Sequence, residues 1–105
     1  MNKRTVCEMI LQEGWCQLHL YANGATLPPH LSGEIALDIG YGLPVPIPDL
    51  VVDEYGVAGT LSFGGHPCWC AVPWTCIYGM MAPDRSGVVW PPDETKKYPK
   101  LRLVK

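Results

Sequence analysis

Glycine and proline interrupt this chain so often that long regular segments are excluded. The sequence holds 11 glycines and 11 prolines among 105 residues. Proline lacks a backbone donor, and glycine weakens the interior of helices and strands, so both residues tend to end regular elements. The segments between them are short and mostly apolar. This spacing favours many short strands joined by turns over a bundle of helices.

Alternation of apolar and polar side chains predicts most of these strands. In the first of them Cys16, Leu18 and Leu20 share one face, and a turn at Asn23-Gly24 follows. In the fourth, Gly59 leaves a gap that another backbone can approach closely. The full set of predicted strands covers residues 16–22, 34–41, 50–53, 57–63, 68–72 and 88–90.

The segment between the second and third strands is rich in proline. Pro44, Pro46 and Pro48 alternate with apolar residues, so every second backbone donor is missing. Such a segment is an edge strand at best, or a connector similar to polyproline II. We interpret it as a rigid loop rather than as a proline motif for another domain.

An amphipathic helix is predicted at residues 3–13. Val6, Met9 and Ile10 follow the i, i+3, i+4 spacing of a helical stripe, and Gly14 is a plausible stop. A single apolar stripe needs one surface to lie on. Either the sheet that follows or a second copy of the protein can provide it.

A second, very short helix is predicted after Pro73, which suits a first helical position. Trp74, Ile77 and Tyr78 then occupy one helical face before Gly79. Together these predictions give a mainly β chain with one longer helix at its N-terminus. The expected fold class is a small barrel or a strongly bent antiparallel sheet.

The composition indicates one folded domain. Hydrophobic residues make up 48% of the chain and charged residues 17%, which is typical of a globular protein. A chain of this length buries roughly two-thirds of its unfolded surface, enough for a modest core. The last fifteen residues differ from this body, and the expected division is a domain at 1–90, a flexible tether at 91–100 and a functional tail at 101–105.

Charge is distributed unevenly along the chain. The last ten residues carry five basic and no acidic side chains, whereas residues 1–95 hold three basic and all ten acidic side chains, a net charge of −7. An acidic body argues against nucleic-acid binding, since neutralised phosphates supply most of that affinity. The basic residues of the tail are Lys96, Lys97, Lys100, Arg102 and Lys105.

The last five residues, Leu101, Arg102, Leu103, Val104 and Lys105, alternate apolar and cationic side chains. Residues 91–100 contain three prolines and one aromatic residue, too little apolar surface to offset the entropy of ordering them. This arrangement indicates a peptide ligand on a tether. The alternative is a basic end that has no partner.

No membrane or secretory segment is expected. The sequence has no apolar run of signal-peptide length at its N-terminus and none near the ~20 residues of a membrane span. We therefore expect a cytoplasmic protein whose five cysteines are mostly reduced.

His66, Cys68, Cys70 and Cys76 are the residues that come nearest to a metal site. Alternate residues of a strand share a face, so two thiols can point at one ion. The paired spacing of structural zinc sites is absent, however. We expect no metal and no cofactor, and interpret the thiols as small buried apolar residues.

Catalytic motifs are also missing from the sequence. It contains no nucleophile elbow, no phosphate loop and no paired acid and base. His19 and His30 are interpreted as polar surface residues. The prediction is therefore a protein without enzymatic activity, and the glycine-rich fourth strand suits a groove in which an extended peptide pairs with exposed backbone.

With these elements in place, the chain resembles the stringent starvation protein B (SspB) family, the adaptors that deliver ssrA-tagged proteins to the ClpXP protease. The resemblance covers about three-quarters of the chain. Its motifs are Gly33-Glu34-Ile35-Ala36-Leu37-Asp38-Ile39, Leu61-Ser62-Phe63-Gly64-Gly65-His66-Pro67, Val72-Pro73-Trp74, Ile77-Tyr78, Val88-Val89-Trp90-Pro91-Pro92-Asp93 and the final five residues.

The resemblance implies an Sm-like, strongly bent β-barrel behind the N-terminal helix, a homodimer, and no catalytic activity. It implies that the tail docks on the N-terminal domain of the ClpX unfoldase. Two departures from the family are a tether of about ten residues, shorter than usual, and a longer stretch before Val88. The residues implied to bind the tag are Leu61, Ser62, Phe63, Gly64, Gly65, His66, Val89 and Trp90.

The main functional hypothesis is thus a non-enzymatic adaptor that binds ssrA-type tags and tethers their carriers to ClpXP. One alternative is a diverged homologue, bacterial or phage-encoded, that redirects or inhibits the protease with a different cargo in the bacterial cytoplasm. Another is a small metal-binding regulatory protein that uses the cysteines.

Overall fold

The structure is a computed structural model that describes residues 2–40, 42 and 47–90. The predicted tether and tail lie outside the described residues. So do residue 41, at the end of the predicted second strand, and residues 43–46 of the proline-rich segment. The elements are α1 (Lys3–Leu11), β1 (Trp15–Tyr21), β2 (Glu34–Gly40), β3 (Val51–Val52), β4 (Gly56–Phe63), β5 (His66–Pro73), the 3-10 helix η1 (Trp74–Cys76), β6 (Ile77–Met81) and β7 (Gly87–Val89).

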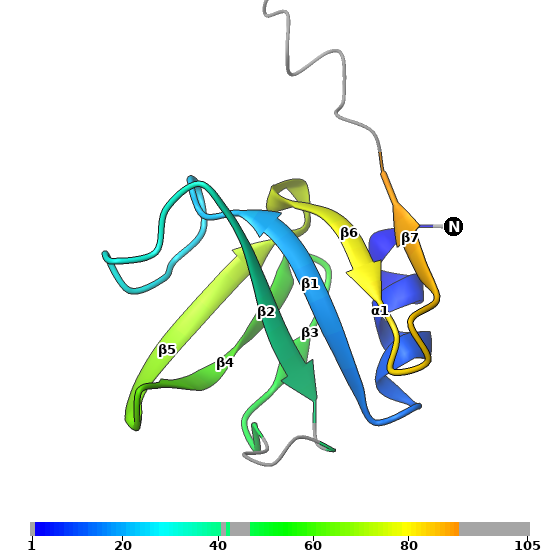
Figure 1. Ribbon diagram of the computed structural model, residues 1–105, viewed down its shortest axis with the longest axis horizontal. Helices are drawn as coiled ribbons and strands as arrows, with labels where there is room; N and C mark the ends of the chain where they lie inside the picture. The colour runs from blue at the N-terminus through cyan, green and yellow to red at the C-terminus, as the bar shows by residue number, and fades with distance from the viewer. Residues whose placement is uncertain (1, 41, 43–46, 91–105) are drawn as a thin grey trace, which may run out of the picture.

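The strands form two antiparallel sheets (Figure 1). One has the order β2-β1-β6-β7 and the other the order β3-β4-β5. An isolated bridge between Thr26 and Ala71 connects the loop after β1 to β5. The prediction of a mainly β chain with an N-terminal helix is confirmed, and each predicted strand occurs with its ends shifted by at most two residues. Within the described ranges the two sheets do not join into a closed barrel.

Helix α1 begins at an N-cap, because the Asn2 side chain accepts a 2.8 Å hydrogen bond from the Thr5 N–H. It packs against β1 and β6. Val6, Cys7 and Ile10 are the buried residues, whereas Met9 is 50% exposed. Val6 and Ile10 of the predicted stripe are therefore buried as expected. The third member, Met9, is exposed, and Cys7 faces the sheet in its place.

The predicted helix after Pro73 is wrong beyond its first turn. Residues 74–76 form the 3-10 helix η1, and Ile77 and Tyr78 begin strand β6, which the sequence pattern did not predict. Strand β1 needs a hydrogen-bonding partner on its second edge, and β6 provides it. Ile77 and Met80 are almost completely buried beneath this sheet. Tertiary pairing thus overrides a helical spacing that only three residues carried.

The gap predicted at Gly59 exists, but the chain itself fills it. A Cβ atom added at Gly59 would lie 2.9 Å from the Ile47 side chain and 3.4 Å from the Leu50 Cα. Just beyond, the Asp49 carboxylate accepts hydrogen bonds from the Thr60 N–H and hydroxyl at 2.9 and 2.7 Å. The segment after the prolines is therefore fixed across β4, and no ligand backbone enters there.

Strands β4 and β5 form a long hairpin whose turn is Gly64-Gly65. Both glycines have positive φ, +59° and +84°, which suits a two-residue hairpin turn. Phe63 and His66 are paired across the base of the turn. The core lies between the sheets and α1, and its most deeply buried members are Leu18, Leu20, Ile39, Ile77, Met80, Cys7, Cys16 and Cys70.

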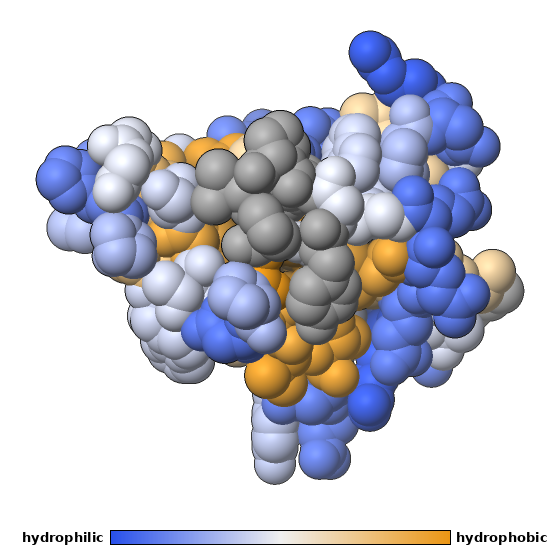
Figure 2. Space-filling view, turned by 90° about the horizontal axis from the view of Figure 1, so that it is seen from below, coloured by the Kyte–Doolittle hydropathy of each residue, from blue (hydrophilic) through white to orange (hydrophobic). Residues whose placement is uncertain are grey.

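Among the described residues no helix is long and apolar enough to cross a membrane. Apolar surface does reach the outside next to the end of α1, where Leu11, Leu50 and Val52 line a cleft of about 320 Å³ with Glu8 and Gln12. Figure 2, seen from below the view of Figure 1, shows apolar surface gathered near the centre of this face.

Candidate functional site

The residues predicted to bind a peptide fall into two separate groups. Leu61 to His66 lie around the turn of the β4–β5 hairpin, whereas Val89 ends β7 and Trp90 follows it. Figure 1 shows the hairpin turn and β7 at opposite ends of the longest axis of the molecule. The structure therefore does not bring the two groups together in one groove.

Within the first group the residues have different environments. Leu61 is only 9% exposed and belongs to the hydrophobic core. Its neighbour Ser62 is exposed, and Phe63 is half-buried against the core. The Phe63 ring makes an edge contact with His30 of the loop after β1, with ring centroids 6.1 Å apart. The remaining residues, Gly64, Gly65 and His66, are exposed.

The outer edge of β5 is the feature here that can bind a peptide backbone. Ala71 exchanges two hydrogen bonds with Thr26, 2.8 and 3.0 Å long, so its backbone groups point away from β4. Backbone direction alternates along a strand, and the N–H and C=O of Trp69 therefore point the same way. Among the described residues no backbone acceptor faces the Trp69 N–H.

The surroundings of this edge suit an extended apolar peptide. The Trp69 indole is 57% exposed on the outer face of β5. Cys68 and Phe63 are half-buried on the other face and pack against the core. A strand added beside Trp69 continues the direction set by the Thr26 bridge and places its side chains alternately on the two faces.

The predicted strand at 68–72 includes Trp69, but the predicted site does not. The Thr26–Ala71 bridge shows that this edge of β5 faces away from β4, and it joins residues 45 positions apart in the sequence. The signal that was available is Pro67, which lacks a donor and is found in strands mainly at edges. Because Pro67 and Trp69 are two residues apart, an edge at one implies an edge at the other.

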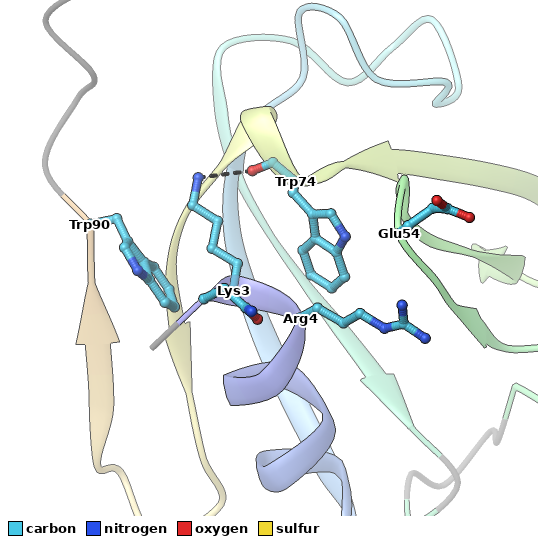
Figure 3. A pocket seen from close by; sticks show the side chains of 6 residues that line it. Lys3, Arg4, Glu54, Trp74 and Trp90 are labelled. Carbon is cyan, nitrogen blue, oxygen red and sulfur yellow. Dashed lines mark hydrogen bonds between the residues drawn. The ribbon is translucent and has the colours of Figure 1, made fainter.

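Trp90 lines a different cavity, a cleft of about 540 Å³ beside the start of α1 (Figure 3). The Lys3 ammonium donates a 2.9 Å hydrogen bond to the Trp74 carbonyl and lies 5.9 Å from the centre of a Trp90 ring. The Trp74 indole N–H in turn donates to the Asp53 carbonyl at 2.9 Å. Figure 3 shows the Lys3 side chain between the two indoles, with Arg4 and Glu54 toward the other side.

Four of the five cysteines are buried like small apolar residues, and the fifth, Cys68, is half-buried. Burial and the neighbouring Cys68 thiol raise the pKa of Cys70 to about 11. The adjacent Cys16 thiol, through a hydrogen bond, and burial raise the pKa of Cys7 above its ordinary range. Thiols that stay protonated at neutral pH are poor nucleophiles and poor metal ligands. In the part of the chain that the structure describes, no three His, Cys, Asp or Glu side chains are placed to hold a metal ion.

The histidines predicted as surface residues differ in their contacts. His30 is exposed beside Phe63. His19 is half-buried on the outer face of the four-stranded sheet, where its Nε2 lies 2.9 Å from the Gln17 side-chain oxygen. Neither contact resembles an acid–base pair.

Comparison with models of known protein families and with curated proteins finds no match for this chain.

Proposed function

We propose that the protein is a non-enzymatic adaptor that binds an extended, ssrA-type peptide tag and docks on the ClpX unfoldase through its C-terminal residues. The observation that carries the proposal is the open edge of β5, where the backbone of Trp69 points outward beside exposed and half-buried aromatic side chains. An unpaired strand edge is a ready template for an added strand. The tag would supply that strand.

The finer fold proposal is an Sm-like arrangement in which the two sheets bend around a shared core. Supporting it are the N-terminal helix, the antiparallel order of both sheets and the bridge from the β1–β2 loop to β5. In this arrangement the tag lies at the β5 edge near Phe63 and His66. Val89 and Trp90 act in a separate region, close to the point where the tether begins.

A homodimer through residues 3–15 is the proposed assembly. Support comes from an apolar cleft of about 330 Å³ between α1 and the β6–β7 hairpin, lined in part by Met9, Ala82 and Val88. Met9 and Val88 are 50% and 41% exposed. Two copies would cover this surface and present two tails to the unfoldase. The proposed place of action is the bacterial cytoplasm, where ClpXP works.

The backbone part of the proposal can be tested at Trp69. Replacing Trp69 by Pro removes the outward N–H and leaves the bonds to β4 in place, because Trp69 and Thr60 form a pair without mutual hydrogen bonds. One lost hydrogen bond costs about 0.5–1.5 kcal/mol, roughly a twofold to twelvefold loss of affinity. A fluorescent ssrA peptide titrated with each variant measures the effect.

The matched control is Trp69→Thr, which removes the same indole and retains the N–H. We expect Trp69→Pro to bind the peptide more weakly than Trp69→Thr, while both variants unfold at a similar urea concentration. Equal affinities for the two variants would exclude backbone pairing at this edge. No binding of the ssrA peptide by the unsubstituted protein would favour a different cargo.

The tail provides a second, independent test. Deleting residues 101–105 should abolish binding to the ClpX N-terminal domain and leave the affinity for the peptide unchanged, because the tether separates the two functions. Replacing Arg102 and Lys105 by Ala should mainly slow association and reduce its dependence on salt. Surface plasmon resonance on immobilised ClpX domain measures both quantities. Full binding by the deleted chain would refute docking through the tail.

A further inference from the structure

The outer face of the four-stranded sheet carries an aromatic and acidic patch. Tyr21 on β1 is paired with Glu34 on β2, and Gln17 is paired with Asp38, so these side chains share one face. Tyr78 of β6 lies beside them. We call this patch the tyrosine face and define it by five residues, His19, Tyr21, Glu34, Asp38 and Tyr78.

Side-chain contacts hold the tyrosine face in a defined arrangement. The rings of Tyr21 and Tyr78 have centroids 4.8 Å apart, and His19 meets Tyr78 edge-on at 6.3 Å. The Tyr78 hydroxyl donates a 3.0 Å hydrogen bond to Glu34, and the Gln17 amide donates one of 3.1 Å to Asp38. Tyr21 is 43% exposed, whereas Tyr78 and His19 are half-buried, so the Tyr21 ring is the part of the patch most open to solvent.

The patch carries negative charge without a cation to balance it. Glu34 and Asp38 are both exposed, and no described basic side chain forms an ion pair with either. Electron-rich faces of tyrosine rings also attract cations. The ligand that fits this surface is therefore a basic peptide segment, whose side chains can lie over the rings and reach the carboxylates.

The chain carries such a segment, and it leaves the fold at this place. Residues 96–105 hold five basic side chains and no acidic one. The Trp90 N–H donates a 2.7 Å hydrogen bond to the Tyr78 carbonyl, so the chain departs directly beside the tyrosine face. The distance across the sheet from β7 to β2 is about three strand spacings, or ~14 Å. Five extended residues, 91–95, span up to ~16 Å, which covers that distance.

We infer that the basic tail, residues 96–105, docks reversibly on the tyrosine face of its own chain. Charge favours this surface over the cleft next to Trp90, because that cleft is lined by two basic side chains, Lys3 and Arg4, and only one acidic side chain, Glu54. The consequence for regulation rests on the proposed function. A docked tail is withheld from the unfoldase, so ionic strength or a competing basic ligand sets the fraction of tails that can engage it.

Trypsin can measure docking without the unfoldase, since it cuts after Lys97, Lys100 and Arg102. We expect the tail of the full-length protein at 20 mM salt to be cut about fivefold to tenfold more slowly than a free peptide of residues 91–105, as for a weak site at millimolar effective concentration. At 500 mM salt the two rates should converge, because exposed charges are screened. Mass spectrometry of the released fragments gives the rates.

The charge dependence is tested with the double variant Glu34→Gln and Asp38→Asn, which preserves the shape of the face. Its tail should be cut nearly as fast as the free peptide. The control is Glu13→Gln with Glu54→Gln, which removes the same charge elsewhere and should retain protection. Circular dichroism establishes that each variant is folded. If the double variant does not fold, the salt dependence of tail cleavage in the unsubstituted protein tests the role of charge instead.

Three results would overturn the inference. These are equal cleavage of tail and free peptide at low salt, equal protection in the two double variants, and protection that rises with protein concentration, which would place the tail on a second copy. Each leaves the adaptor proposal intact, since binding of the tag and of the ClpX domain is measured separately.

Discussion

Leu61 shows how a single residue can belong to the core although its neighbours line the surface. It is 9% exposed and is paired with Cys68 across β4 and β5, whereas Ser62 next to it is exposed. A polar side chain at position 61 would be buried among apolar atoms. The family resemblance implies a role for Leu61 in tag binding, and in the structure its side chain packs into the core beneath the hairpin.

We therefore expect Leu61→Gln to lower the free energy of unfolding by about 2–4 kcal/mol, since it buries an amide and leaves an imperfectly packed site. Ser62→Gln, one residue away and exposed, should change stability by less than about 0.5 kcal/mol. Urea unfolding followed by tryptophan fluorescence gives both values. Comparable stability of the two variants would show that position 61 is not part of the core.

At the scale of elements, strand β4 depends on the segment that precedes β3. Asp49 accepts two hydrogen bonds from Thr60, and these hold the segment against β4. The Thr60 hydroxyl, followed by the Thr60 N–H, lowers the pKa of Asp49 below its ordinary value. Ile47 packs against Gly59 in the same region. The hydrogen bonds and the missing side chain at Gly59 together fix where this segment crosses the sheet.

Acid should weaken the hydrogen bonds between Asp49 and Thr60. A lowered pKa in the folded state means that ionised Asp49 contributes stability above its unfolded pKa, about 4, and that the contribution is lost as the pH falls through the folded value. Asp49→Asn should therefore be less stable than the unsubstituted protein at pH 7, and the difference should shrink by pH 3. Urea unfolding at both pH values measures it.

Thr60→Val is the matched control, because it removes the hydroxyl donor and retains the N–H. Its acid dependence should lie between those of Asp49→Asn and the unsubstituted protein. A stability difference for Asp49→Asn that is the same at pH 3 and pH 7 would contradict the assignment of the hydrogen bonds to the ionised carboxylate.

At the scale of the whole molecule, α1 lies between two apolar clefts. One is on the side of β7 and includes Met9, and the other is on the side of β3 and includes Gln12. The proposed dimer uses the first of them. A charge placed in that cleft would be buried in the dimer and exposed in the monomer, so the two faces of the helix provide a direct comparison.

Met9→Asp should weaken the dimer by at least tenfold, since burying an unpaired carboxylate costs more than about 1.4 kcal/mol. Gln12→Asp introduces the same charge on the other side of the helix and should leave the dimer unchanged. Sedimentation equilibrium over a range of concentrations measures both dissociation constants. A monomer mass for the unsubstituted protein at every concentration would remove the dimer from the proposal.

The strands were predictable because their signals are local. The alternating apolar side chains predicted for strands at 16–22 and 34–41, and the glycine pair at 64–65, are patterns of residues adjacent in the sequence. The structure has strands β1 and β2 and the hairpin turn at these places. Strand β6 was not predictable in the same way. Ile77 and Tyr78 fit the face of a short helix as well as a strand, and only the pairing with β1 decides between the two.

Some features of the candidate site were likewise predictable from local sequence, and others were not. The exposed hairpin residues and the edge character of Pro67 can be inferred from the sequence, and so can the opposite charges of body and tail. The sequence could not show that Val89 and Trp90 lie far from the hairpin, because β7 pairs with β6 in the other sheet. Nor could it show that Gly59 is covered by Ile47.

The sequence by itself determined the class of the fold, the turns and the charge asymmetry, since each follows from side-chain chemistry within a few neighbouring residues. Only the tertiary structure decided which strand edges stay open and which side chains share a face. Those properties depend on pairings between distant segments, such as Thr26 with Ala71 and Trp90 with Tyr78, whose geometry no local pattern specifies.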